Sequence, residues 1–422
     1  MTESARRPFI KQALRAAASA AVALGTARAA RSESSAAAAG GATPDWQEIR
    51  RSFALAAGHA YLNTATLGAA PRHALDEVAR GYQLLAADPE SARTDLYGRV
   101  ERSVRPALAR LLGADPDEIA LTSSASESLY LISNGIALEP GDEVVTTNQD
   151  HPAGIDPWTI RAERSGIDVR QVSIPSPFTS GGQVVDLFRE ALSASTRVLS
   201  FCHVTRGGHL FPVKALCALA RERGIVSAID GAQALGMMEV DLHGLGCDLY
   251  AGSPHKWLLA PSGNGMLYVR RKAQARLVSL FERPGAGGRD ARRYEHVGTY
   301  ALPVRVALGA ALELFGRLGI RDVERRNRAL SDHLKAGLDS IPRVRRISLT
   351  SREVSSAGIT LFEIEGIKAM EFQPRVLQKY RIHVDEHVRN GHDAVRVSTH
   401  FYNSREEFDL LLEILKHEIR RS

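Results

Sequence analysis

The sequence predicts an α/β protein, with a mostly parallel sheet covered by helices and a smaller α+β C-terminal domain. Two observations favour this class. From about residue 70 to residue 300, helix-like and strand-like segments alternate along the chain, which is typical of parallel sheets with helices on their faces. Beyond residue 300, two long helical patterns come first and short strand-like runs follow, which predicts a separate α+β unit.

The first part contains short elements at regular spacing. Helices are expected at 74–86, 96–112, 127–134, 160–165 and 213–223. Strands are expected at 118–121, 143–147, 169–173, 198–202, 225–229 and 266–269. Several of these runs are almost continuously apolar, as in strands that are buried on both faces of a sheet.

A Gly-rich loop at 284–288 leads into the second part. Helices are expected there at 304–318, 323–338 and 406–419. Strands are expected at 358–363, 382–385 and 394–398. We therefore divide the chain into five segments: a signal peptide at 1–29, a flexible tether at 30–45, an N-terminal arm at 46–70, a large domain at 71–300 and a small C-terminal domain at 301–422.

The composition is that of an ordinary globular protein, with 44% hydrophobic and 24% charged residues among 422. The net charge of +6 is concentrated at the N-terminus, because residues 1–29 hold five of the 54 basic and one of the 48 acidic residues. The remainder is close to neutral. The sequence therefore gives no support for a nucleic-acid-binding surface.

The N-terminal segment is typical of an export signal. Arg6-Arg7-Pro8-Phe9-Ile10-Lys11 matches the twin-arginine pattern, an Ala-rich stretch follows, and Ala27-Arg28-Ala29 fits a cleavage site after Ala29. A basic amphipathic helix or a short anchor is the alternative, but the apolar run is too short to span a bilayer. We expect no stable membrane anchor, transport by the twin-arginine machinery, which carries folded proteins, and a periplasmic mature protein.

Two polar residues follow strand-like runs in the middle of the chain. The run 224–229 leads into Asp230, and the run 247–252 leads into a turn with Lys256. The carboxyl ends of parallel strands form the ligand-binding edge of an open sheet. A lysine amine holds an aldehyde as a Schiff base, and a carboxylate keeps a pyridine nitrogen protonated. Pyridoxal 5'-phosphate (PLP) chemistry needs both, although either residue alone fits a surface lysine or an ordinary strand-end aspartate.

Longer motifs around these residues are similar to those of a known family. Asp230-Gly231-Ala232-Gln233 is followed by a segment at 253–268 that reads Ser-Pro-His-Lys-Trp-Leu-Leu-Ala-Pro-Ser-Gly-Asn-Gly-Met-Leu-Tyr. This combination resembles the class-V aminotransferases, a family of fold-type-I PLP enzymes. The resemblance runs from about Trp46 onward, and the loop 61–71 is similar to the isopenicillin-N-epimerase-like branch. It implies a fold-type-I PLP transferase, with Lys256 and Asp230 as catalytic residues that hold the cofactor. It also implies that the large domain at 71–300 binds PLP and that the arm at 46–70 lines the active site.

The segment 122–127 offers hydroxyls and backbone amides between a strand and a helix, which suits a phosphate group. By resemblance, the phosphate-binding residues are Ser124, Ala125, Ser126, Ser253 and His255. A plain serine N-cap with a capping-box glutamate is a second interpretation, and both can hold. In the family, a threonine of the partner subunit often completes this site. Thr299 stands at that place, so the resemblance implies a homodimer with shared active sites.

Four further residues receive roles from the resemblance. His151, in Asp-His-Pro-Ala, would stack on the PLP ring and relay protons as a catalytic residue, although a histidine that caps the next helix is the alternative. Gln233 would bond the phenolic oxygen of PLP. Arg396, in Arg-Val-Ser-Thr-His-Phe-Tyr-Asn, would bind the substrate α-carboxylate, because its planar guanidinium suits bidentate contact. Otherwise an arginine in an apolar strand needs a buried acidic partner. Asn63 lies in the loop that lines the substrate pocket.

Arg206 departs from the family pattern. It follows His203-Val204-Thr205, where relatives carry a neutral residue, and the segment is one residue short. Three interpretations are open: Arg206 binds a second carboxylate of the substrate, it pairs with the surroundings of Asp230, or it points to solvent.

The chain has three cysteines, Cys202, Cys217 and Cys247. Their spacing fits no metal site, and we expect them to be buried small side chains. Cysteine desulfurases need a mobile cysteine ahead of the carboxylate-binding arginine, and 380–395 contains none. Desulfuration through a cysteine persulfide is therefore not expected.

We expect a PLP enzyme that acts at the α-carbon of an amino acid or an amino-acid-containing peptide. Aminotransferase or epimerase chemistry is favoured, and the residues do not choose between transamination, epimerisation and elimination. A carbon–sulfur lyase that needs no cysteine is the second hypothesis. A non-catalytic PLP-binding protein is the third, and the complete set of Asp230, His255, Lys256 and Arg396 argues against it.

Overall fold

The computed structural model describes residues 44–280 and 290–421. The segment Trp46–Ser422 forms one compact unit, so its division into an arm, a large domain and a small domain stays a prediction. The predicted signal peptide, most of the tether and the Gly-rich loop at 284–288 lie outside the described residues.

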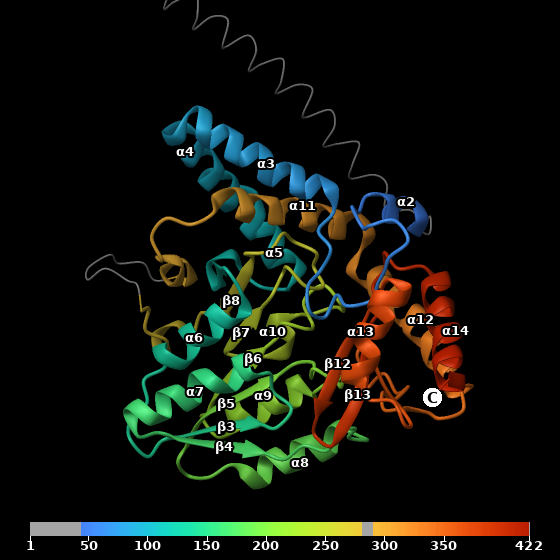
Figure 1. The fold of residues 1–422 in the computed structure, drawn as a ribbon. Coiled ribbons are helices and arrows are strands. Elements are labelled where there is room, and N and C mark those ends of the chain that lie inside the picture. The colour runs from blue at the N-terminus through green and yellow to red at the C-terminus, as the bar shows by residue number, and fades with distance from the viewer. Residues whose placement is uncertain (1–43, 281–289, 422) are drawn as a thin grey trace, which may run out of the picture. The chain divides into compact units, whose positions relative to one another are not determined.

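A seven-stranded sheet forms the main layer of this unit (Figure 1). Its strands run in the order β2-β8-β7-β6-β5-β3-β4. All neighbours are parallel except β8, which is antiparallel to both β2 and β7. The strand bounds are β2 Ile119–Thr122, β3 Glu143–Thr147, β4 Asp168–Val172, β5 Thr196–Cys202, β6 Val226–Asp230, β7 Leu249–Gly252 and β8 Gly265–Val269. The fold class predicted from the sequence is confirmed.

Helices cover both faces of this sheet (Figure 1). One face packs apolar side chains of α6 (Ala125–Gly135) and α7 (Pro152–Ser165). The other packs side chains of α8 (Gly181–Ala191) and α9 (Val213–Glu222). Because both faces are buried, β6, β7 and β8 contain only buried residues, which explains their continuous apolar runs.

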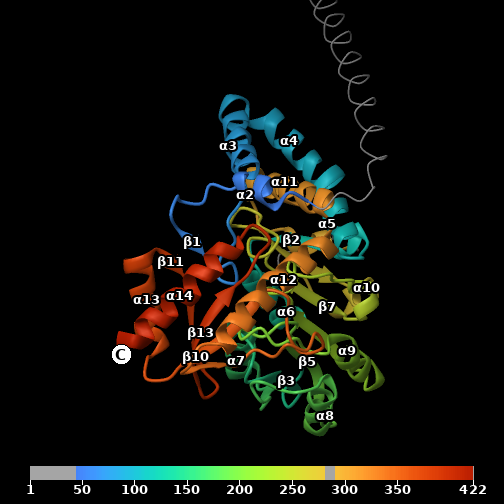
Figure 2. The same ribbon diagram turned by 90° about the vertical axis from the view of Figure 1, so that its right-hand side faces the viewer.

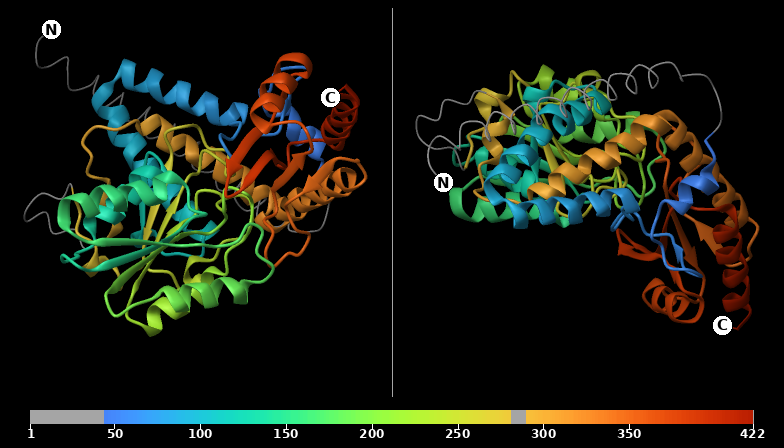
Figure 3. Two further views of the ribbon diagram at one scale, coloured as in Figure 1. Left: turned by 60° about the horizontal axis from the view of Figure 1, so that its bottom comes forward. Right: turned by 90° about the horizontal axis from the view of Figure 1, so that it is seen from above.

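Long helices near the two ends of the unit pack together. Figure 3 shows α3 (Arg72–Ala87) running alongside α11 (Leu302–Leu318). The remaining helices between 44 and 280 are α2 Trp46–Arg51, α4 Pro89–Arg99, α5 Arg105–Leu111 and α10 Leu242–Leu245. A π-helical turn at Val100–Val104 joins α4 to α5.

A second, four-stranded antiparallel sheet follows in the order β12-β13-β10-β9. Its strands are β9 Val344–Arg346, β10 Ile359–Ile364, β12 Asp385–Arg389 and β13 His392–Ser398. Three helices pack against it: α12 Ile320–Asp339, α13 Ala369–Tyr380 and α14 Arg405–Arg421 (Figure 2). Val395 and Val397 of β13 point into the core that these helices form, so Arg396 between them points to the opposite face of the sheet.

The chain before residue 72 forms a separate two-stranded sheet with a later segment and also contacts the turn after β7. Its strand β1 (Ala60–Tyr61) pairs in parallel with β11 (Ile382–His383). The backbone N–H of Gly68 donates to the carbonyl of His255 at 2.9 Å. This segment therefore lies between the C-terminal sheet and the turn that follows β7.

Most predicted elements are confirmed, and the misses have identifiable causes. The helix expected at 160–165 begins at Pro152, and α13 was missed altogether. These helices contain the internal prolines Pro157 and Pro374, respectively. In the sequence both indicate a helix breaker, because proline removes a backbone donor inside a helix. The strand expected at 382–385 is divided between β11 and β12. The helix α8, which begins with two glycines, was also not predicted. Among the described residues, no helix is long and apolar enough to cross a membrane.

Candidate active site

A cavity opens at the carboxyl edge of the seven-stranded sheet. The space, including the part open to solvent, amounts to about 580 Å³, which is in the range of small-molecule sites. The residues predicted for the site that line this cavity are Ser124, Ala125, Ser126, His151, Arg206, Asp230, Gln233, Ser253, His255 and Lys256. Three other predicted residues, Asn63, Thr299 and Arg396, are not among its lining residues. The convergence follows from the topology, because the polar residues come directly after the ends of neighbouring strands.

Lys256 lies on the turn after β7, where its backbone N–H donates to the carbonyl of Ser253 at 3.0 Å. Burial lowers the pKa of its ammonium group; Asp230 opposes this shift, and the guanidinium groups of Arg396 and Arg206 add to it. A lower pKa leaves more of the amine unprotonated near neutral pH. The free amine is the form that attacks an aldehyde.

Asp230 ends β6 and is only 9% exposed. Its Oδ1 accepts the backbone N–H of Ala232 at 2.9 Å. Its Oδ2 makes no hydrogen bond to any residue within 44–280 or 290–421. This oxygen is not among the fully buried atoms and is open to the cavity that Asp230 lines. The arrangement therefore suits a protonated ring nitrogen placed in the cavity.

The start of α6 forms the opposite wall of the cavity. Ser124 caps this helix, because its Oγ accepts the backbone N–H of Glu127 at 3.1 Å, and the Glu127 carboxylate in turn accepts the N–H of Ser123 at 2.7 Å. The serine-cap interpretation is thus correct for this segment. Ser253 reaches the same helix end, where its Oγ accepts the N–H of Ala125 at 3.3 Å. Backbone amides and hydroxyls at a helix N-terminus suit an anion such as phosphate.

His255 also faces this wall. Its Nδ1 lies 2.8 Å from the carbonyl oxygen of Asn264 and must carry the proton of that bond. Burial lowers the pKa of the ring, partly offset by this hydrogen bond. A contact from Nε2 to a phosphate oxygen therefore needs a second proton, on the ring or on the phosphate.

Gly265 lets β8 pass close behind the start of α6, the part of the cavity predicted to bind phosphate, which we call the phosphate wall. A β-carbon at this position would lie 2.5 Å from the Cα of Ser124, so Gly265→Ala must push the start of α6 out of place. We expect the Kd for PLP to rise by at least about ten-fold, the size of one lost phosphate contact. Dialysis followed by titration of the visible absorption measures this Kd. Gly316→Ala on α11, where a β-carbon would meet nothing within 4 Å, is the control and should bind PLP as the parent does.

His151 is both the cap of a helix and a wall of the cavity. Its Nδ1 accepts the backbone N–H of Ala153 at 3.1 Å, so the helix-capping interpretation is correct. Because Nδ1 accepts, the proton of the neutral ring is on Nε2. Burial lowers the pKa of the ring, with Asp230 opposing the shift and Lys256 adding to it. His151 is thus a neutral imidazole whose placement also suits the predicted stacking role.

Gln233 links the cavity to the segment before residue 72. Its Nε2 donates to the carbonyl of Ala65 at 2.9 Å, and its Oε1 accepts the indole N–H of Trp257 at 2.8 Å. One Nε2 hydrogen remains for the predicted bond to the cofactor. Gly68 is packed so closely that a β-carbon there would collide with the carbonyl of Lys256. This segment therefore braces the turn that carries the lysine.

The two arginines predicted to bind substrate are already engaged with acidic residues that sequence reasoning missed. Arg396 pairs with Asp385, and Arg206 donates to the carboxylate of Glu386 at 2.8 Å. Hence Arg396 does have an acidic partner, which the sequence argument had set aside. A signal was available, because Asp385 ends the strand that the sequence predicts at 382–385. In the structure it is the first residue of β12, and its register opposite Arg396 cannot be read from the sequence. Asn63 precedes Thr66 by three positions, and the Oγ1 of Thr66 accepts a hydrogen bond from Arg396. The Oδ1 of Asn63 is buried and has no partner among the described residues.

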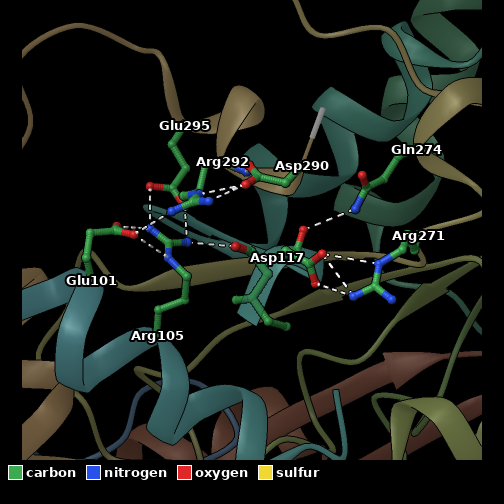
Figure 4. A network of polar contacts seen from close by, with 9 residues as sticks. Glu101, Arg105, Asp117, Arg271, Gln274, Asp290, Arg292 and Glu295 are labelled. Carbon is green, nitrogen blue, oxygen red and sulfur yellow. Dashed lines mark hydrogen bonds and ion pairs between the residues drawn. The ribbon is translucent and has the colours of Figure 1, made fainter. Parts of the chain in front are cut away.

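Thr299 is exposed and follows a firmly anchored segment (Figure 4). Glu295, just before it, accepts the guanidinium of buried Arg105 at 2.5 Å and the backbone N–H of Leu121 at 2.6 Å. Arg305 adds a third contact at 3.3 Å. These bonds tie the segment to β2 on the edge of the main sheet. The contribution of Thr299 to a partner's site stays a prediction.

The three cysteines are free and buried, as predicted. Burial raises the pKa of Cys217 to about 12 and raises the pKa values of Cys202 and Cys247 well above the usual value. None of them lines the cavity. They are therefore packing residues without nucleophilic character.

Comparison with known proteins identifies the family. The family model described as aminotransferase class-V matches residues 60–411. The chain belongs to the class-V aminotransferase family. The isopenicillin N epimerase of Streptomyces clavuligerus is 29% identical over 394 residues, which span 89% of this chain and 98% of the relative. A probable cysteine desulfurase of Methanothermobacter thermautotrophicus is 27% identical, over 88% of this chain and 97% of that protein.

Solved structures of this class-V aminotransferase fold agree. A C-DES mutant with glycine covalently linked to its PLP cofactor has a TM-score of 0.81 at 24% identity, covering 89% of this chain and 99% of that one. An apo cysteine desulfurase from Thermococcus onnurineus has a TM-score of 0.80 at 22% identity, covering 91% and 100%. These likenesses establish the fold-type-I architecture.

PLP is the cofactor of this family member, and the residues present fit it. Lys256 offers an amine of lowered pKa, Asp230 offers an unpartnered carboxylate oxygen, and the start of α6 offers a phosphate wall. When bound, PLP supplies an electron sink for a substrate carbanion.

Proposed function

We propose that this class-V family member catalyses a PLP-dependent reaction at the α-carbon of an amino acid, or of an amino acid within a peptide, of the aminotransferase or epimerase type. The observation that carries the proposal is the convergence of Lys256, Asp230 and His151 on one cavity at the carboxyl edge of the sheet. A base, an electron-sink partner and a ring-facing imidazole are the groups that such a reaction needs.

Each residue has a defined task in this proposal. The Lys256 amine would hold the cofactor, and as a free amine it would take the α-proton of the substrate as a general base. Asp230 would keep the ring nitrogen of the cofactor protonated. Arg396 binds the α-carboxylate, and His151 supports the ring face. The burial of Lys256, which lowers the pKa of its ammonium group, favours its role as a base near neutral pH.

The relatives support two reaction types. Two isopenicillin N epimerases, including one of Amycolatopsis lactamdurans that is 30% identical over 88% of this chain, favour epimerase-type chemistry. A carbon–sulfur lyase is the second candidate, supported by the fold likeness to the cystine C–S lyase C-DES, at a TM-score of 0.78. The buried cysteines outside the cavity argue against a persulfide route in either case.

Export and dimerisation belong to the same proposal. The twin-arginine pattern in residues 6–11 supports a periplasmic enzyme, exported after folding with its cofactor. The exposed position of Thr299 on a segment held by buried ion pairs supports a role in the site of a second copy of the chain.

The visible spectrum of the purified PLP-loaded protein tests the reaction type. The protein is mixed with a panel of amino acids and amine-bearing peptides. Irreversible bleaching to the pyridoxamine form by one compound would establish transamination. A persistent yellow band with loss of optical activity, or with exchange of the α-proton for solvent deuterium, would establish epimerisation. Release of pyruvate and a thiol from cysteine conjugates would establish the lyase. Absence of any visible band in PLP-supplemented protein would end the proposal.

A further inference from the structure

We propose that the carboxylate of Asp385 occupies the position on Arg396 where the carboxylate of a substrate binds. When a substrate carboxylate arrives, the Asp385 side chain moves to Arg206. The inference rests on the proposed role of Arg396 in binding that carboxylate. It makes Asp385 a specificity-determining residue, and it gives Arg206 the task of holding the displaced carboxylate.

Arg396 is buried, and its Nη2 atom already has two partners. It is 3% exposed and is not among the residues that line the cavity. Its Nη2 donates to the Oγ1 of Thr66 at 2.8 Å and also to the Oδ2 of Asp385. Thr66 donates in turn to the same Oδ2 at 3.2 Å. A carboxylate therefore already sits where an incoming one would bind.

Arg396 keeps unused hydrogen-bonding capacity. Its Nε is buried and has no partner within the described part of the chain. Burial lowers the pKa of the guanidinium to about 10, although the charge of Asp385 acts in the opposite direction. One acidic partner thus does not compensate for burial of the cation, and a bidentate carboxylate would satisfy it better.

Arg206 lies close enough to Asp385 to become its second ion-pair partner. Its Nη2 lies 3.5 Å from the Oδ2 of Asp385, the oxygen atom that also binds Arg396. The same Nη2 donates to the backbone carbonyl of Glu386 at 2.8 Å, which fixes the guanidinium beside β12. The Nε of Arg206 is buried without a partner among the described residues. A short shift of one side chain would therefore exchange one arginine for the other.

The surroundings allow this shift. The side chain of Asp385 is 19% exposed, and that of Arg206 is 24% exposed, so neither is locked in a dry core. Arg206 also lines the cavity, which places the acceptor of the displaced carboxylate beside the substrate. The exchange leaves the substrate carboxylate on Arg396, and Arg206 then shares its charge between Asp385 and Glu386, with which it is already paired at 2.8 Å.

Removing the charge of Asp385 tests the competition. The probe is propionate, a carboxylate without an amine, titrated into the PLP-loaded enzyme by isothermal calorimetry. We expect Asp385→Asn to bind propionate about ten-fold more tightly, because a partly buried ionic competitor is lost. For a reactive amino acid, KM should fall by a similar factor while kcat changes little. Glu363→Gln is the matched control, since Glu363 lies in the same sheet, is paired with Arg345 and has an equal side-chain exposure of 19%.

The alternative is that Asp385 merely holds Arg396 in place. Asp385→Asn would then bind propionate as weakly as the parent or more weakly, and this result would overturn the inference. Arg396→Gln separates that failure from a failure of the proposed function. If the parent binds propionate and Arg396→Gln does not, Arg396 is the carboxylate site whatever Asp385 does. If neither the parent nor Asp385→Asn binds it, both proposals fall.

Discussion

Replacing Lys256 by alanine is expected to abolish turnover by at least about 10⁴-fold, because the variant loses both the covalent attachment of PLP and the general base at the α-carbon. The phosphate wall at α6 and the carboxylate of Asp230 remain, so PLP should still bind without a covalent link. Burial lowers the pKa of Lys256, so the alanine also removes a buried amine and should leave the protein folded. Rates are measured with the substrate found in the spectral screen, and cofactor content is measured after gel filtration.

Lys272→Ala, at an exposed position after β8, serves as the control and should retain parental activity. A small added amine should restore part of the activity of Lys256→Ala, because it replaces the missing base. Turnover of the PLP-bound variant within ten-fold of the parent would instead assign the base to another residue, with His151 as the nearest alternative in the cavity.

We also expect the free energy of unfolding to fall steeply below pH 6.5. Burial lowers the pKa of His203 and His209 to about 4, and that of His387 and His400 to about 3. Each histidine has a pKa near 6.5 when unfolded. Because each gains its proton only on unfolding, its contribution is fully present above pH 6.5 and is lost as the pH falls toward the folded pKa.

The four groups together should lower the free energy of unfolding by about 5.5 kcal/mol between pH 8 and pH 5.5, about 1.4 kcal/mol for each histidine. Burial raises the pKa of Asp150 to about 6. Because the folded state takes up this proton more readily than the unfolded state, Asp150 stabilises the fold as the pH falls. It offsets about 1 kcal/mol of the loss caused by the histidines. The net loss approaches the whole stability of an ordinary domain. Urea unfolding of the PLP-loaded protein at pH 8.0 and 5.5 measures it.

His387→Leu isolates one contribution. Both ring nitrogens of His387 are buried without partners in the described chain, so an apolar replacement loses no hydrogen bond. We expect this variant to lose about 1.4 kcal/mol less than the parent between the two pH values. His417→Gln, on an exposed position of α14, should lose as much as the parent. Equal losses in His387→Leu and the parent would show that His387 titrates normally in the folded protein.

The layers of the fold could be predicted because hydrophobic periodicity determines them. Continuous apolar runs such as that of β6 predict a doubly buried parallel strand, and the long amphipathic patterns of α11 and α12 have no competing interpretation. The prediction failed for elements whose local patterns conflict. The helix α13 was missed because it contains Pro374 near its middle, and the single strand predicted at 382–385 is in fact divided between two sheets. Local sequence does not record which partner strand a segment will find.

The cavity residues could be predicted for a similar reason. Asp230 ends β6, and Lys256 and Ser124 follow β7 and β2 within four residues. Parallel strands bring their carboxyl ends to one edge. The contacts of Arg396 and Arg206 could not be predicted in this way. Asp385 meets both through antiparallel register and through the close approach of two sheets, and these depend on the packing of the whole unit. The helix caps at Ser124 and His151 show a second limit, because one side chain can end a helix and face a ligand at the same time.

The long-range ties of the segment before residue 72 determine when the active site can form. Arg50 pairs with Glu407 at 2.7 Å across 357 positions, and β1 pairs with β11 across more than 300. Contacts of this separation form late, because a long loop must close first. Until α14 has folded, Glu407 is not in place to pair with Arg50, and the segment that braces the turn of Lys256 lacks this anchor. The active site is therefore completed only after segments from both ends of the folded unit have met.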